Sequence, residues 1–482
     1  MMKRTLCVIL FGIFMIYWPG IVASSEADGK TNGMAMIKLF EARENKTTVD
    51  EVKKLLKNEI DFNCTDMYGY PVLACAINCT NNPEIVDTLI KAGADVNAIG
   101  ALNKHTVLHI AAICDASPAI MSMLLKAGAD VNARNSFGST PLFYSFLSPE
   151  NMQILINAGA DVNARDTLGN TPLLDGAMLP YTLAFVEILV KAGANINERD
   201  SRHGRTAFLL AAACNENPEM LTELVRLGAD IHARDSLGLD ALMNAANFGN
   251  TPEVIRRLIE MGIDVNATTE TGKTALIYAA TEGHSNTVAT LIGLGANIGS
   301  KDQDGRNALL NAAIKSSFSS LFIKIAASLV EAGANINETD NFGKSALYYA
   351  AEANELDAME ALVKEGADAG IRLENGRSVL MQSLNHWRYF SRECMDCILA
   401  TGVDINARDN EGKTALMWTV GICHGKRNKE SREYFEYAVN RLLKAGADKT
   451  IKDNFGKTAF DYAKEQEELA DTDACRQLDP NI

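Results

Sequence analysis

The sequence is short of positive charge. Its 46 Lys and Arg residues stand against 61 Asp and Glu, a formal net charge of −15 at pH 7. A surface of this sign repels phosphate backbones and anionic lipid headgroups over most of its area. Nucleic acid is therefore not an expected partner.

Signatures of common active sites are missing as well. The sequence contains no HExxH, GxSxG or GxGxxG motif. The segment GICHGKR (421–427) resembles a phosphate-binding loop, but it has three residues instead of four between its glycines and no Ser or Thr after Lys426. The 7 histidines are scattered, and the acidic residues recur at turns, where capping is their expected role. We expect neither catalysis nor a cofactor.

Long apolar runs are absent except at the N-terminus. Lys3 and Arg4 precede an apolar run at 6–18, and a Pro-Gly pair with small residues follows it. This order is typical of a secretory signal peptide, and the run is too short to span a bilayer comfortably. We expect cleavage after Ala23 and no stable membrane insertion, with an uncleaved anchor as the alternative.

The sequence is rich in one repeated phrase. Its glycine stands at Gly93, Gly128, Gly159, Gly193, Gly228, Gly262, Gly295, Gly333, Gly366, Gly402 and Gly446. Most steps are near 33 to 36 residues, and with a partial unit at each end the chain has about twelve units. A period of this size predicts a repeat array, in which each unit buries its apolar face only against its neighbours.

The local pattern of one unit predicts its structure. Asp166–Gly169 has the residues of a tight turn, and Thr171 with Pro172 then opens a helix as N-cap and first helical residue. A second, amphipathic helix ends at Gly193, which suits a left-handed C-cap. The extended segment 194–200 leads into the next turn. Each unit is therefore predicted to be a turn followed by two helices.

This pattern resembles the ankyrin repeat over about residues 34–470. The motifs that carry the resemblance are KHTVLHIAA (104–112), GSTPLF (138–143) and GKTALIYAATEGH (272–284). The resemblance implies an all-α solenoid of helix–turn–helix units with short β-hairpin fingers along one edge. We accordingly expect a signal peptide at 1–23, a linker at 24–33, the solenoid at 34–470 and a C-terminal tail at 471–482.

The cysteines form one suggestive motif. Cys394 and Cys397 make a CxxC, and Cys423 follows in the next unit. Counting back from Gly402 places the pair on the apolar stripe of a second helix, so buried core cysteines are expected, with a disulfide, a redox pair or a zinc site as alternatives. Cys79 and Cys114 hold equivalent places in adjacent units, roughly 8–10 Å apart, which favours free thiols over a disulfide.

Two surfaces are candidates for binding a partner. The first is the row of residues that precede the turn glycines: Tyr68, Phe137, Leu168, Leu237, Phe342 and Phe455. This finger position contacts partners in ankyrin-like proteins, but its regular apolar character favours packing between fingers.

The second candidate surface is a basic and aromatic island formed by two links between helices in consecutive units. Its residues are His386, Trp387, Arg388, Tyr389, Arg392, Lys426, Arg427, Lys429 and Arg432. Aromatic and Arg side chains are frequent interface anchors, and insertions in a repeat array mark its binding face. A solvated loop is the alternative.

The expected function is the binding of another protein on the concave face and helix–loop rim of the array. A signal peptide in front of an ankyrin-like array favours the periplasm of a Gram-negative cell over full secretion. Two alternatives stay open: a thiol-redox or metal-dependent protein built on Cys394, Cys397 and Cys423, and a structural spacer.

Overall fold

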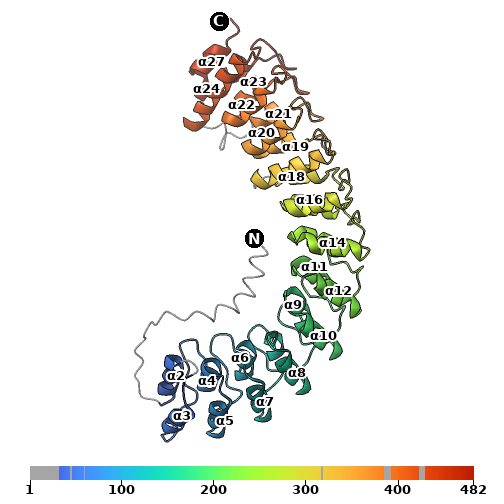
Figure 1. The fold of residues 1–482 in the computed structure, drawn as a ribbon. Coiled ribbons are helices and arrows are strands. Elements are labelled where there is room, and N and C mark those ends of the chain that lie inside the picture. The colour runs from blue at the N-terminus through green and yellow to red at the C-terminus, as the bar shows by residue number, and fades with distance from the viewer. Residues whose placement is uncertain are drawn as a thin grey trace. The chain divides into compact units, whose positions relative to one another are not determined.

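The computed structural model describes residues 32–43, 46–58, 60–315, 319–384, 392–422 and 429–481. Within these ranges the chain is helical and forms no β-strand. It divides into two compact units, residues 1–241 and 242–482, both drawn in Figure 1. The expected signal peptide and nearly all of the expected linker lie outside the described residues.

The first unit is a stack of helix pairs. The pairs are α2 (Asn32–Arg43) with α3 (Val49–Leu55), α4 (Val72–Thr80) with α5 (Pro83–Lys91), α6 (Val107–Ile113) with α7 (Pro118–Lys126), the 3-10 helix η1 (Pro141–Tyr144) with α8 (Pro149–Asn157), α9 (Pro172–Met178) with α10 (Leu183–Lys191), and α11 (Ala207–Cys214) with α12 (Pro218–Arg226). First helices pack on first helices, as α9 does on α11, and second helices pack on second helices, as α5 does on α7 (Figure 1).

The second unit repeats this arrangement. Its pairs are α13 (Ala241–Phe248) with α14 (Pro252–Glu260), α15 (Ala275–Thr281) with α16 (Ser285–Gly293), α17 (Ala308–Ile314) with α18 (Ser319–Glu331), α19 (Ala346–Ala353) with α20 (Leu356–Lys364), α21 (Val379–Ser383) with α22 (Arg392–Ala400), and α23 (Ala415–Ile422) with α24 (Lys429–Lys444); α25 (Ala459–Lys464), α26 (Glu467–Ala470) and α27 (Asp473–Leu478) end the chain.

The C-terminal segment is not the tail that the sequence suggested. Helix α27 packs on α24 and α25 and buries Ala474, Cys475 and Leu478. Thr472 caps this helix, since its hydroxyl accepts the backbone N–H of Cys475 at 3.1 Å. The segment therefore covers the apolar end of the stack, as a terminal cap must in a repeat array.

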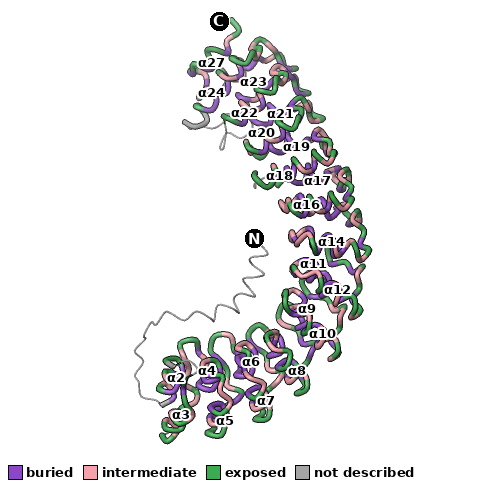
Figure 2. The backbone as a smooth tube through the Cα atoms, in the orientation of Figure 1, coloured by how far each residue is buried: buried purple, intermediate pink, exposed green. Residues whose placement is uncertain are grey.

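The helix boundaries follow the predicted signals. Thr171 is the N-cap of α9, with Pro172 as the first helical residue, and Gly193 has a φ of +96° just beyond α10. Small side chains of the first helices, such as Ala111 and Ala211, are fully buried, which lets neighbouring helices approach closely. Figure 2 shows the buried residues on the helices, with the loops largely exposed.

The loops that join one helix pair to the next are called fingers below. In the finger after α8, Asp166 Oδ1 accepts the backbone N–H groups of Leu168 and Asn170, both at 2.8 Å. Four of the described fingers contain an isolated antiparallel bridge, such as that of Thr65 with Pro71. Where β-hairpins were expected, the described fingers are thus turns with one bridge or none, because the chain enters a helix immediately after the turn.

Neighbouring fingers are tied together by hydrogen bonds. The backbone N–H of Thr167 donates to the carbonyl of Phe137 at 2.8 Å. Farther from the tip, Asn132 Nδ2 donates to the Gly159 carbonyl at 3.0 Å, and its Oδ1 accepts the Asp161 N–H at 2.8 Å. These bonds fix the distance and register from one finger to the next.

Candidate partner-binding surfaces

The predicted finger-tip residues lie at the surface. In the first unit Tyr68 and Phe137 are each 51% exposed and Leu237 is 68% exposed. In the second unit Phe342 is 55% exposed and Phe455 is 71% exposed. Packing between successive tips therefore covers only part of each side chain, and the remainder is available for contact with another molecule.

A row of arginines flanks the tips in the first unit. Arg134, Arg165 and Arg199 each donate from Nη1 to two carbonyls, that of their own turn glycine and that of the arginine one finger further on. The two distances are 2.9 and 2.6 Å for Arg134, 3.0 and 3.2 Å for Arg165, and 2.5 and 2.6 Å for Arg199. Each guanidinium is therefore held at one place in its finger, at the spacing of the repeats.

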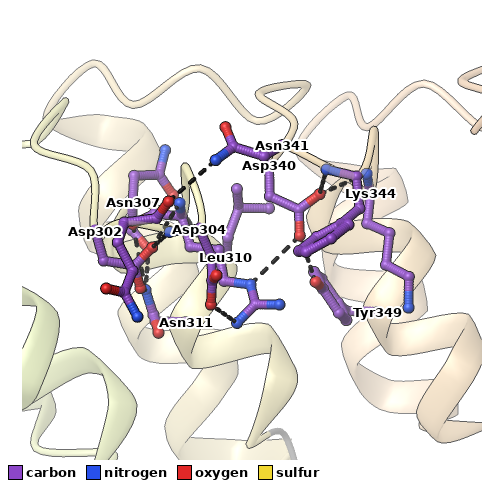
Figure 3. Close-up of polar contacts among 12 residues, drawn as sticks. Asp302, Asp304, Asn307, Leu310, Asn311, Asp340, Asn341, Lys344 and Tyr349 are labelled. Carbon is purple, nitrogen blue, oxygen red and sulfur yellow. Dashed lines mark hydrogen bonds and ion pairs between the residues drawn. The ribbon is translucent and has the colours of Figure 1, made fainter. Parts of the chain in front are cut away.

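In the second unit a different polar network joins the fingers to the first helices. Tyr349 of α19 donates its hydroxyl to Asp340 Oδ2 at 2.5 Å (Figure 3). Arg306 Nε donates to the same oxygen at 3.3 Å, and Asn311 Nδ2 donates to Asp302 Oδ2 at 3.0 Å. The Oδ1 atoms of Asp302 and Asp340 accept backbone N–H groups of their own turns. Both oxygens of each buried carboxylate are therefore paired, as burial of a charge requires.

Aromatic rings recur in this network beside cations. Tyr349, Trp418 and Tyr462 each donate to the aspartate nine residues earlier in the chain, at 2.5, 2.8 and 2.5 Å. The Arg377 guanidinium lies 3.9 Å from the centre of the Trp418 ring, and Lys344 Nζ lies 5.0 Å from that of Tyr349. Contacts of this geometry are attractive, so the network stabilises the stack.

The island expected on the rim is described only in part. His386, Trp387, Arg388, Tyr389, Lys426 and Arg427 lie outside the described residues, and Lys429 is the first residue of α24. The Arg392 guanidinium lies 4.6 Å from the centre of the Tyr437 ring of α24, and exposed Arg432 forms an ion pair with Glu436 at 3.4 Å. The two predicted links thus lead into helices α22 and α24, which contact each other.

Comparison with known proteins agrees with this architecture. A family model of three ankyrin repeats matches residues 108–200, 208–302 and 287–372, and a model of the single ankyrin repeat matches residues 68–101. The chain belongs to the ankyrin-repeat family. No curated protein matches it. Ankyrin repeats are protein-interaction scaffolds, so a protein is the class of partner that the fold indicates.

The described cysteines of the ankyrin repeats are all buried or half-buried. None of the described cysteines is joined in a disulfide bond, and this includes Cys79 and Cys114. Cys394 is buried, and burial, followed by the nearby Glu360, raises the pKa of Cys397 to about 11. No group of three or more His, Cys, Asp or Glu side chains there is placed to hold a metal ion. Cys423 lies outside the described residues.

Two buried histidines interrupt the otherwise apolar packing near α6. His105 and His109 stack with ring centres 5.5 Å apart, and both rings meet the edge of Tyr144. His109 Nε2 donates to the Ser139 carbonyl at 3.0 Å while its Nδ1 accepts the Thr106 N–H at 3.2 Å, but both ring nitrogens of His105 are buried without a partner. Burial lowers the pKa of each histidine to about 4.

Sequence reasoning missed the arginine row. Its signal is visible in the segments NARN (132–135), NARD (163–166) and NERD (197–200), in which an Arg precedes the first residue of each turn. The side chain's two bonds to neighbouring carbonyls depend on the stacking of fingers, so the motif alone does not reveal them.

Among the described helices none is both long and apolar enough to cross a bilayer.

Proposed function

We propose that this chain is an exported, non-catalytic scaffold that binds another protein along its fingers and helix–loop rim. The observation that carries the proposal is the row of exposed apolar tips on fingers tied by hydrogen bonds, such as that from Thr167 to Phe137. Because the tips are fixed before binding, a partner does not have to order them, and this lowers the entropy cost of association.

Export is supported by the N-terminal sequence. Two basic residues, an apolar run of signal-peptide length and a small-residue segment ending near Ala23 follow one another there. Combined with an ankyrin array, this order favours a periplasmic protein. Fractionation of cells that produce the full chain tests the location, and N-terminal sequencing of the exported protein tests cleavage after Ala23. Retention of the uncleaved chain in the cytoplasm would contradict export.

The redox alternative is less well supported. A thiol with a pKa near 11, such as Cys397, is almost entirely protonated at neutral pH, and the thiolate is the nucleophile in disulfide exchange. Its CxxC partner Cys394 is buried. The spacer alternative makes a different prediction, since a spacer tolerates any substitution at the finger tips that leaves the fold intact.

A capture experiment with three baits tests the scaffold. The first bait is residues 24–482, the second adds Tyr68→Ser, Phe137→Ser and Leu168→Ser, and a control carries Val225→Ser and Leu321→Ser, exposed apolar positions on second helices. Each is exposed to an envelope extract, and any captured protein is purified and its binding re-measured.

Three results are informative. A protein that binds the first bait and the control but not the finger variant supports binding by the fingers. If a protein binds all three baits, the fingers are not its binding surface and the rim is the remaining candidate. A fourth bait with Trp387→Ala, Arg388→Glu, Lys426→Glu and Arg427→Glu then tests the rim. If none of the baits captures a protein, the scaffold function is contradicted and a spacer is favoured.

A further inference from the structure

The arginine row of the first unit already holds one carboxylate of the chain itself. Arg165 Nη2 forms an ion pair with Glu198, which belongs to the next finger, and Asn195 Nδ2 donates to the other Glu198 oxygen at 2.9 Å. The second unit has the same arrangement, in which Lys301 pairs with Glu338 and Asn335 Nδ2 lies 3.3 Å from the second oxygen. This position in a finger is therefore built to receive a carboxylate.

Two arginines of the row face no such carboxylate. The residue equivalent to Glu198 is Ala164 opposite Arg134 and Ala233 opposite Arg199. In the described part of the chain neither arginine has a carboxylate oxygen within 4.0 Å. By contrast, Arg234 lies 3.8 Å from Asp240.

A second position in the finger, three residues before the one equivalent to Glu198, also carries acidic residues, but these do not form ion pairs with Arg134 or Arg199. Arg372, in the second unit, reaches Asp404 of the next finger at 3.4 Å. The residue equivalent to Asp404 is Asp161 opposite Arg134 and Asp230 opposite Arg199, and the structure records no ion pair in either place. Since Nη1 of both arginines is fixed by two carbonyls, their remaining N–H groups are held in the orientation that Arg165 uses to bind Glu198.

We propose that Arg134 and Arg199 bind carboxylates of an acidic, extended segment of a protein partner, with the apolar tips between them contacting its apolar side chains. This inference rests on the proposed function and names the chemistry of the partner. Carboxylates match the planar fork of the guanidinium, and Glu198 displays that match within the chain. Phe137, on the same finger as Arg134, is 51% exposed, and Leu168, on the finger between the two arginines, is 37% exposed. These two tips supply the apolar contact.

The repeat spacing sets the spacing of the partner's acidic residues. Arg134 and Arg199 are two repeats apart, roughly 20 Å at about 10 Å per packed helix. An extended chain advances about 3.3 Å per residue, and alternate side chains share a face. The partner segment is thus expected to carry carboxylates about six residues apart on one face, with apolar residues at the two same-face positions between them.

The probe for this inference is a labelled peptide of eleven residues with Glu at positions 3 and 9, Leu at 5 and 7, and Ser or Thr elsewhere. Its controls replace both Glu residues by Gln or move the second Glu to position 6. Binding to residues 24–482 is measured by fluorescence anisotropy. We expect the Glu peptide to bind about tenfold more tightly than either control, a typical difference for two exposed ion pairs.

Three variants with unchanged net charge localise the effect. The filled variant transplants the Asn–Glu pair through Asp161→Asn, Ala164→Glu, Asp230→Asn and Ala233→Glu. The control variant carries the same Asn–Glu pair on another finger, through Asp130→Asn and Ala133→Glu. The preceding finger has Ile99 at the position equivalent to Arg134, so the new carboxylate covers no arginine of the row. The opened variant carries Asn195→Asp and Glu198→Ala, which releases Arg165.

The filled variant is expected to bind the Glu peptide no better than the Gln peptide. The control variant should match the original protein, and the opened variant should bind more tightly. The opened variant keeps the test valid even if circular dichroism shows that the filled variant is misfolded. Equal affinity for the Glu and Gln peptides, or loss of affinity in the control variant alone, would overturn the inference. Unlabelled Glu peptide and short inorganic polyphosphate are also compared as competitors for the labelled peptide. If polyphosphate displaces the labelled peptide at a lower concentration of negative charge than the Glu peptide does, the inference is overturned in favour of a phosphate ligand.

Failure of this inference is distinct from failure of the scaffold. If the filled variant retains a protein that the finger-tip variant loses, the chain is a scaffold whose partner does not use the arginines. If no bait retains any protein, the scaffold itself is contradicted.

Discussion

The buried histidine pair predicts that the first unit loses stability in mild acid. His105 is 5% exposed and His109 is fully buried, and burial lowers the pKa of each to about 4 from an ordinary value near 6.5. In the unfolded chain both rings take up protons as the pH falls below 6.5, whereas in the folded chain they stay neutral until about pH 4. The free energy of unfolding therefore falls as the pH is lowered from about 6.5 to about 4. The full contribution of the neutral histidines to stability is present only above about pH 6.5.

The size of the effect follows from the two pKa values. For one histidine, linkage gives a loss of about 2 kcal/mol between pH 7 and pH 5. His105 offers the cleaner test because neither of its ring nitrogens has a hydrogen-bond partner to lose. In a His105→Phe variant the aromatic contacts with His109 and Tyr144 are retained, and the buried group that resists protonation is gone.

The assay is urea unfolding followed by far-UV circular dichroism at pH 7, 6 and 5. Hydrogen exchange of segment 104–144 then locates the change within the first unit. We expect the His105→Phe variant to be close to the original protein at pH 7 and about 2 kcal/mol more stable relative to it at pH 5. A His232→Gln variant, at an exposed position, is the control. A difference between His105→Phe and the original protein that is constant from pH 7 to pH 5 would refute the reasoning.

Three further predictions concern a contact between two fingers, a contact between a helix and a finger, and the reactivity of one thiol. Asn132→Ala removes both bonds to the next finger and is expected to lower the free energy of unfolding by about 1–2 kcal/mol in urea titrations, whereas no loss would mean that water replaces them. Tyr349→Phe removes the donor to buried Asp340 and should cost about 1–3 kcal/mol in thermal melts, while Tyr68→Phe at an exposed tip should cost almost nothing. Cys397 is expected to react slowly with a thiol reagent at pH 7 and faster as the pH approaches 11, and rapid reaction at pH 7 would revive the redox alternative.

Several elements of the fold were predictable because their signals are local. Thr171 and Pro172 mark a helix start whatever surrounds them, since an N-cap hydroxyl and a fixed proline φ act within one turn. The C-terminal segment was misjudged for the opposite reason. It is short and polar in sequence, and only α24 and α25 provide the apolar surface that holds α27 in place.

The binding surfaces divide in the same way. The period of the sequence identified the finger positions of Tyr68, Phe137 and Phe342, because equivalent residues in a repeat array occupy equivalent places. Their exposure was not predictable, since regular apolar character is equally consistent with packing between fingers. The rim residues from His386 to Tyr389 remain a prediction from the sequence.

The sequence by itself determined the repeat, its helices and turns, and the class of partner, because each depends on residues close together in the chain. The tertiary structure alone decided which arginines are paired. Arg134, Arg165 and Arg199 stand in nearly identical local sequences, yet only Arg165 meets a carboxylate, that of Glu198 from the next finger. Such a contact joins residues 33 positions apart, and its energy depends on a distance that only the stacking of neighbouring fingers sets.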